Sequence, residues 1–140
     1  MRREAIAPRP NWQRKVEEVG LSFHTQDGVP YWAADRCYAF TADEIDGIEA
    51  LTNELHRLCL EAAEQIVLRN WHSRLAIPEW AVDYVNAVWE RGDPSFVGRS
   101  DLAYDGSGPP RTLEYNADKP TTLVEAAVAS WFWLNDVKPG

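Results

Sequence analysis

Cysteine is scarce in this chain, which has only two among its 140 residues. Cys37 and Cys59 are too few, and too unpatterned, for a disulfide framework or a zinc site, so we expect a reducing compartment, the cytoplasm. Long apolar runs are missing too, and the opening Met-Arg-Arg-Glu has no hydrophobic segment of the kind that forms a secretion signal. We therefore expect no membrane-bound role.

Basic residues are in the minority. The chain has 14 Lys and Arg against 22 Asp and Glu, which gives a formal net charge of −8. A negative surface repels phosphate backbones and anionic lipid headgroups, so neither nucleic acid nor a membrane is the expected partner. The length suits one domain with a modest core, and we treat residues 1–140 as a single domain.

Two runs of alternating polar and apolar residues flank a turn rich in Gly and Pro. The first run lies within residues 98–105, the turn covers 106–110, and the second run covers 111–116. Alternation with a period of two is typical of half-buried strands, and the turn residues between them favour a hairpin. Thr122, followed three residues later by Glu125, fits a capping box that opens a helix. The sequence therefore predicts strand, turn, strand and helix.

The hydrophobic pattern indicates which side chains of this hairpin share a face. The favoured parity gives an apolar face of Leu102, Tyr104, Leu113 and Tyr115, and a polar face of Arg99, Asp101, Glu114 and Asn116. The opposite parity would mix apolar and charged groups on both faces. In the favoured parity Asp101 lies near Glu114, and two adjacent carboxylates repel unless a positive charge lies between them.

A divalent cation would suit the position between these carboxylates. Two carboxylates and an amide oxygen are hard ligands of the kind that Mg²⁺ accepts, with water and phosphate oxygens completing its shell. Arg99 would add positive charge where a transferred phosphoryl group or an oxyanion becomes more negative. The alternative is an ordinary solvated face in which Arg99 pairs with a carboxylate. The spacing alone leaves both interpretations open.

Longer motifs in the chain add a family resemblance. The runs Gly-Arg-x-Asp-Leu-Ala-Tyr-Asp-Gly from Gly98 and Leu-Glu-Tyr-Asn-Ala-Asp-x-Pro-Thr from Leu113 resemble the signature of the glutathionylspermidine synthase family, the ATP-grasp-like amide ligases. The upstream pieces that are similar to that family's amino-terminal region are Phe23-His24-Thr25, Asp27-Gly28, Pro30-Tyr31-Trp32 and Glu54-Leu55-His56. The similarity runs over almost the whole chain, from about residue 9 to residue 136.

The resemblance implies a fold, an activity and residue roles. The fold would be α+β, with helices packed on a small, mostly antiparallel sheet, as in the part of the ligase that precedes the ATP-grasp half. The activity would be ATP- and Mg²⁺-dependent joining of a carboxylate to an amine through an acyl phosphate, with glutathione and spermidine, a polyamine, as the substrates in the named family. By resemblance, Asp101, Glu114 and Asn116 are metal ligands, Arg99 is the catalytic charge stabiliser, and Asp118, Thr121 and Thr122 bind substrate at a helix start.

The rest of the chain predicts further helices and short strands. Residues 1–10 suggest a loose start, residues 11–19 a short helix, and Asp27-Gly28 a hairpin turn. A capping box from Thr41 to Glu44 begins a long helix, and a second helix begins near Pro78 and stops at Gly92. The long helix carries an apolar stripe that we expect to be buried, made of Ile45, Ile48, Thr52, Leu55, Cys59, Ala62 and Ile66. His56 lies one turn from Cys59, a spacing that metals can use. Because no second pair of soft ligands is present, we expect a capped or surface histidine instead.

The last predicted helix is apolar on every side at residues 131–134, Trp-Phe-Trp-Leu. Such a helix has to be buried all round, yet only six residues follow it. We therefore expect a continuation of the chain or a partner chain to cover Trp131 to Leu134. We also expect this chain to be the amino-terminal part of a longer ligase whose other half binds most of the ATP. The alternatives are a non-catalytic remnant and a domain that docks on a partner.

Overall fold

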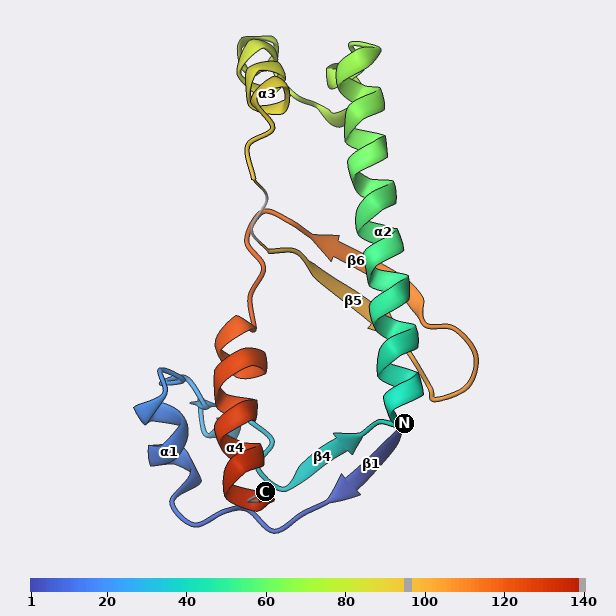
Figure 1. Cartoon of the computed structure of the whole chain (residues 1–140). Helices are drawn as coiled ribbons and strands as arrows, with labels where there is room; N and C mark the ends of the chain where they lie inside the picture. The colour runs from blue at the N-terminus through green and yellow to red at the C-terminus, as the bar shows by residue number, and fades with distance from the viewer. Residues whose placement is uncertain (95–96, 139–140) are drawn as a thin grey trace.

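The longest element that the structure describes is one helix, α2 (Ala42–Leu68), which runs along one side of the molecule (Figure 1). The computed structural model describes residues 1–94 and 97–138. The helix begins at the predicted capping box, where Thr41 Oγ1 accepts a bond from the Glu44 N–H at 3.2 Å and the Glu44 carboxylate accepts one from the Thr41 N–H at 2.8 Å. At a rise of 1.5 Å per residue, its length is about 40 Å.

The described strands form three separate antiparallel pairs, which confirms the α+β fold class. The pairs are β1 (Arg2–Ala5) with β4 (Arg36–Ala39), β2 (Thr25–Gln26) with β3 (Val29–Pro30), and β5 (Arg99–Ala103) with β6 (Arg111–Asn116). The prediction of a loose start for residues 1–10 is wrong, because β1 supplies the hydrogen-bonding partner of β4.

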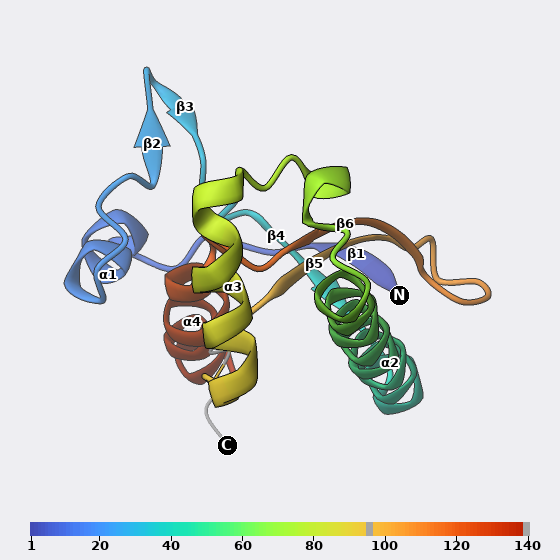
Figure 2. The same ribbon diagram turned by 90° about the horizontal axis from the view of Figure 1, so that it is seen from above.

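The turn between β2 and β3 forms at Asp27-Gly28, as predicted. Asp27 has a φ of 51° and Gly28 a φ of 78°, the pair of left-handed residues that a tight hairpin turn requires. Figure 2 shows this ribbon projecting away from the rest of the chain.

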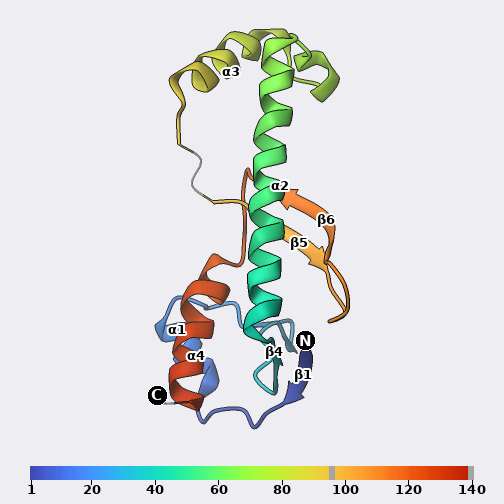
Figure 3. The same cartoon turned by 45° about the vertical axis from the view of Figure 1, so that its right-hand side comes forward.

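The helices occupy two regions of the molecule. Near the C-terminal end of α2 lie the short 3₁₀-helix η1 (His72–Leu75) and α3 (Glu79–Arg91), which stops at the left-handed Gly92, φ 63° (Figure 3). At the opposite end of the molecule, α1 (Trp12–Glu18) lies beside a π-helix, η2 (Val124–Ala129), which continues into α4 (Ser130–Val137). Among the described residues, no helix combines the length and the apolar character that crossing a membrane requires.

The buried core is small and lies where α1 meets the π-helix. It consists of Val16, Leu21 and Ala129, with three partly buried side chains packed against it, Trp12, Val19 and Trp32. Nearby, the Asp136 carboxylate accepts hydrogen bonds from Arg9 Nη1 at 2.8 Å and Lys15 Nζ at 2.7 Å, which ties the N-terminal segment to α4. These two bonds hold the pKa of Asp136 below its usual value.

The prediction that the apolar stripe of α2 is buried is wrong. No residue of α2 is buried: Ile48, Leu55 and Ile66 are half-buried, and Ile45 is exposed. The reason is that few described elements pack along this helix: the β5–β6 hairpin lies against one part of it and α3 near its end (Figures 1 and 3). The periodicity identifies the inward face of α2 correctly, but burial depends on what lies opposite.

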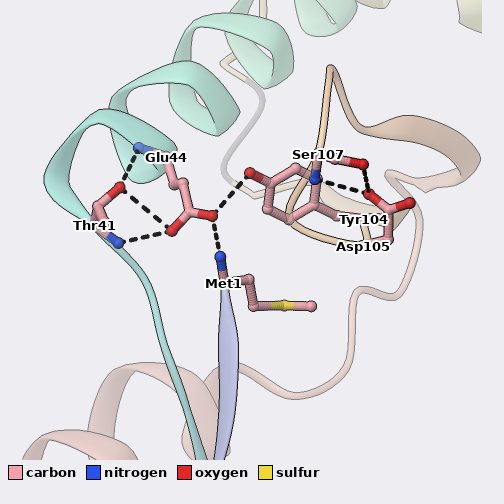
Figure 4. Close-up of polar contacts among 6 residues, drawn as sticks. All are labelled: Met1, Thr41, Glu44, Tyr104, Asp105 and Ser107. Atoms are coloured by element: carbon pink, nitrogen blue, oxygen red, sulfur yellow. Dashed lines mark hydrogen bonds and ion pairs between the residues drawn. The ribbon is translucent and has the colours of Figure 1, made fainter.

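Glu44 joins the N-terminus of the chain to the hairpin (Figure 4). Its Oε1 atom accepts hydrogen bonds from the N-terminal ammonium of Met1 and from the Tyr104 hydroxyl, the latter at 3.0 Å. The ammonium bond is the main cause that lowers the pKa of Glu44 to about 2 from an ordinary 4.5, and the Thr41 N–H adds to it. The carboxylate therefore stays charged under all but strongly acidic conditions.

We expect Leu21→Ala to lower the free energy of unfolding by about 2–5 kcal/mol, because it leaves a cavity in the fully buried cluster. Leu113→Ala is the matched control, since the same truncation at a side chain that is 70% exposed should change stability by no more than about 0.5 kcal/mol. Urea unfolding measures both. Equal losses in the two variants would show that the cluster is not the core.

Glu44 should make the stability of the chain depend on pH in acid. Because its folded pKa is about 2 and its ordinary value is 4.5, its contribution is complete above pH 4.5 and is lost as the pH falls toward 2. We expect Glu44→Gln to be less stable than the unaltered chain at pH 6 and the difference to shrink steadily below pH 4.5. A difference that stays constant from pH 6 to pH 2.5, measured by urea unfolding at each pH, would contradict this assignment.

Candidate functional site

The β5–β6 hairpin aligns the polar residues that the sequence predicts to lie together. Arg99 pairs with Asn116 and Asp101 pairs with Glu114, with the pair Ser100 and Tyr115 between them. Because side chains alternate along each strand, the two outer pairs share one face and the middle pair lies on the other. The predicted pairing of the polar residues is therefore confirmed.

A β-bulge follows directly after the pair formed by Asp101 and Glu114. Leu102 pairs with Thr112, so Leu113 is the extra residue, and its side chain is 70% exposed. The prediction that Leu113 joins Leu102 on the apolar face is therefore wrong. A bulge is a common way of redirecting strands next to a functional site, and this one lies beyond the polar face without disturbing its alignment.

Arg99 lies at the centre of the polar face. Its guanidinium donates to both Asp101 carboxylate oxygens, from Nε at 2.8 Å and from Nη2 at 3.3 Å, and its Nη2 lies 4.0 Å from Glu114 Oε1. A third bond runs from Nη1 to Thr121 Oγ1 at 2.5 Å. The bonds to Asp101 are the main cause that raises the pKa of Arg99. The two carboxylates thus share one positive charge, as expected for like charges in facing positions.

Asn116 holds the loop that follows the hairpin. Its Oδ1 accepts a hydrogen bond from the Lys119 N–H at 3.1 Å, and the amide oxygen has a second lone pair for another partner. Among the described residues, no group of three or more His, Cys, Asp or Glu side chains could hold a metal. A metal on this face would therefore take its third protein oxygen from Asn116. Two carboxylates and this amide fit the hard-donor preference of Mg²⁺.

The predicted substrate-binding residues, which lie in or next to the loop at 117–121, make contacts in different places. Thr121 contacts Arg99 on the polar face, whereas Asp118 lines a cavity of about 650 Å³ that also borders Ser100 and Tyr115. Thr122 has a φ of 73°, and its hydroxyl donates to the Thr121 carbonyl at 2.5 Å rather than capping a helix. The structure therefore brings Thr121 into contact with Arg99, whereas Asp118 lines the cavity beside Tyr115 and the Thr122 hydroxyl bonds within its own loop.

The capping box predicted for Thr122 and Glu125 is wrong, because Glu125 has another partner. The Tyr31 hydroxyl donates to Glu125 Oε1 at 2.9 Å across 94 residues of sequence. This bond raises the pKa of Tyr31, and the nearby Arg99 charge opposes the rise. Tyr31 therefore lies close enough to Arg99 for the guanidinium charge to act on its hydroxyl, and it brings Glu125 with it. Sequence reasoning missed both as site residues, although Tyr31 belongs to a motif that resembles the family.

His56 contacts the strand that carries the polar face, which its sequence context did not suggest. Its Nδ1 is hydrogen bonded to the Tyr115 hydroxyl at 2.8 Å, in a partly buried position. Tyr115 lies between Glu114 and Asn116 on β6, so this bond connects α2 to the strand that carries two candidate ligands. The sequence feature that could have indicated this contact is the alternation of β6, which turns Tyr115 away from the polar face.

The family described as "Glutathionylspermidine synthase preATP-grasp" matches residues 3–140. A protein of Haemophilus influenzae named "Putative acid--amine ligase" is 36% identical over 133 residues, which cover 93% of this chain and 34% of that protein. The chain thus spans about a third of the length of this relative.

The charge of Arg99 should compete with a divalent cation on the polar face. We expect Arg99→Gln to tighten the binding of Mn²⁺, a spectroscopic substitute for Mg²⁺, by about fivefold, because a unit charge a few ångströms away is worth about 1 kcal/mol even in water. Arg111→Gln, at the far end of the same hairpin, is the control and should change the affinity by less than about twofold. Weaker Mn²⁺ binding by Arg99→Gln in a titration would contradict this arrangement.

Proposed function

Because the chain belongs to the family of glutathionylspermidine synthase preATP-grasp domains, we propose that it is the metal-binding part of an ATP-dependent ligase that joins a carboxylate to an amine. The observation that carries the proposal is the alignment of Asp101 with Glu114 and of Arg99 with Asn116 on one face of the hairpin. Facing carboxylates are unfavourable in an ordinary hairpin, and a function that requires cations explains why they are present.

When bound, Mg²⁺ and ATP would supply the phosphoryl group that converts the substrate carboxylate to an acyl phosphate, which the amine then attacks with release of phosphate. Asp101, Glu114 and Asn116 would hold the metal through oxygen atoms. Their combined charge of −2 balances one divalent cation, which leaves the charge of Arg99 for the substrate.

Arg99 would stabilise the negative charge that develops during phosphoryl transfer. Asp101 and the Thr121 hydroxyl both hold its guanidinium when no metal is bound, and the bond to Thr121 would remain once the Asp101 carboxylate turns to the metal. A charge held in place before the reaction costs no reorganisation when the transition state forms. Thr121 therefore acts in the proposal by orienting Arg99, and Asp118 and Thr122 contribute to substrate binding only if the loop at 117–121 rearranges.

The family resemblance is also the basis on which we propose the substrates and the cellular location. The carboxylate would be that of a glutathione-like peptide and the amine a polyamine. The ligase would act in the cytoplasm, which agrees with the free, half-buried Cys37 and Cys59.

The remaining two thirds of such a ligase would bind most of the ATP and cover the apolar surface of this chain. Trp131, Phe132 and Leu134 of α4 are 60%, 51% and 40% exposed, as expected for a helix that requires a covering segment. An apolar groove of about 560 Å³ between α2 and α3 is also open, and Leu60, Ile66 and Val88 are among the residues that line it. Either a continuation of the chain or a partner chain would fill these positions.

The second candidate function is a docking domain with no catalytic role of its own. The observation that favours it is the large surface: the chain exposes 10559 Å², whereas a compact monomer of its mass exposes about 7,400 Å². The excess of about 3,000 Å² on one chain is at least as large as the area that one partner buries in a permanent interface, about 1,000–2,500 Å². The ligase proposal explains the same excess as the contact with the nucleotide-binding part, so the two differ only in whether the polar face is used.

A chimera can test the ligase proposal. We would join this chain to the remaining part of the Haemophilus influenzae relative and measure phosphate release that depends on ATP, Mg²⁺, a carboxylate and an amine. Asp101→Asn and Glu114→Gln should each lower kcat by at least about a hundredfold, because each removes a ligand charge while keeping the shape of the side chain. Asp105→Asn, in the turn of the same hairpin, is the matched control and should keep its activity.

The outcomes separate the two candidates. If the chimera turns over and both ligand variants do not, the ligase proposal stands. Activity that survives Asp101→Asn and Glu114→Gln would refute the metal assignment. A chimera that folds, binds ATP and is inactive with every acid and amine tested would favour the docking domain.

A further inference from the structure

Tyr115 lies directly behind the polar face of the hairpin. It pairs with Ser100, and the pairs on either side of it are Arg99 with Asn116 and Asp101 with Glu114. Its side chain points to the opposite face, toward α2, because neighbouring residues of a strand alternate. Any rotation or shift of the Tyr115 ring therefore acts on the backbone from which the candidate ligands project.

Two contacts hold this ring. On one side the Tyr115 hydroxyl is hydrogen bonded to His56 Nδ1 at 2.8 Å, and the two rings meet edge to face with their centroids 6.2 Å apart. On the other side the ring lies against Gly98, so closely that a Cβ atom at residue 98 would be 2.5 Å from the hydroxyl oxygen and 2.7 Å from Cε2. Only glycine leaves room for the ring next to Arg99.

Tight packing does not hold the ring in place. Tyr115 and His56 both border the cavity of about 650 Å³ behind the hairpin, so neither side chain is enclosed. With space on that side, the ring could turn without displacing neighbours. Its position is therefore set by the His56 bond and by the contact with Gly98.

We propose that Tyr115, His56 and Gly98 are positioning residues that set the geometry of the candidate metal ligands. The bond to His56 anchors the middle of β6 to α2, a rigid helix, and so fixes where Glu114 and Asn116 project. Gly98 lets the ring seat against the start of β5 and so fixes Arg99 and Asp101 relative to them. This inference rests on the proposed function, since it concerns the same polar face.

The chain contains a matched control for this role. The Tyr104 hydroxyl also ties the hairpin to α2, through a hydrogen bond of 3.0 Å to Glu44. Tyr104 lies just beyond the end of β5, past the bulge and away from the polar face. Removing either hydroxyl deletes one bond between the hairpin and α2, but only Tyr115 lies behind the ligands.

The experiment measures Mn²⁺ affinity and stability in the full 140-residue chain. We expect Tyr115→Phe to weaken Mn²⁺ binding by about three- to tenfold, the effect of one hydrogen bond, and Tyr104→Phe to change it by less than about twofold. Both variants should lose similar stability in urea. An equal effect of the two variants on Mn²⁺ affinity would show that the bond to His56 is only structural and would overturn the inference.

Two further variants test the other parts of the arrangement. Gly98→Ala should weaken Mn²⁺ binding by more than about tenfold, because the added Cβ displaces the whole ring. His56→Leu should match Tyr115→Phe, and the double variant should be no worse than either, since all three delete the same bond. Additive losses would argue against a shared bond. Failure of the unaltered chain to bind Mn²⁺ would instead refute the metal-binding proposal itself.

Discussion

The repulsion between two carboxylates that face each other across one hairpin is the constraint that shapes this site. Asp101 and Glu114 are direct partners in the β5–β6 ladder, so their charges cannot separate unless the register changes. Like charges in facing positions destabilise a hairpin. Arg99 offsets this repulsion, because its guanidinium donates to the Asp101 carboxylate and its Nη2 lies 4.0 Å from Glu114 Oε1. Arg99 thus stabilises the face when no metal is bound, and would be freed to contact a phosphate when a cation takes over that role.

The hairpin holds this alignment without a large core around it. Among the described residues, the buried apolar side chains lie where α1 meets the π-helix, whereas two tyrosine hydroxyls attach the hairpin to α2. Their partners, His56 and Glu44, are 12 residues apart on α2, a span of about 18 Å along a rigid helix. Fixing a two-stranded ribbon at both ends restricts its twist, which suits an element whose side chains have to meet a ligand.

The parts of the structure that depend on neighbouring residues could be predicted from the sequence. Patterns a few residues long predict four of these features: the capping box at Thr41, the turn at Asp27-Gly28, the helix end at Gly92, and the pairing of Asp101 with Glu114. The predictions that were wrong concern segments whose structure depends on residues far away in the sequence. The strand β1 has no alternating apolar pattern and forms because β4 lies beside it, and the capping box at Thr122 is lost because Tyr31 binds Glu125 from 94 residues away. The roles of the polar residues in metal binding and catalysis stay predictions that follow from the family resemblance.

The same distinction explains why the long helix is exposed although its pattern is that of a buried one. An apolar stripe indicates which face of a helix packs against other elements. Here the stripe of α2 is only half-buried, the groove beside α3 is open, and Trp131 and Phe132 of α4 are exposed. The polar face, by contrast, needs only the two strands, the loop at 117–121 and the bond from His56, all of which the chain itself supplies. The cation-binding chemistry that we propose can therefore be measured in the isolated chain, whereas turnover needs the surface that would cover its apolar helices.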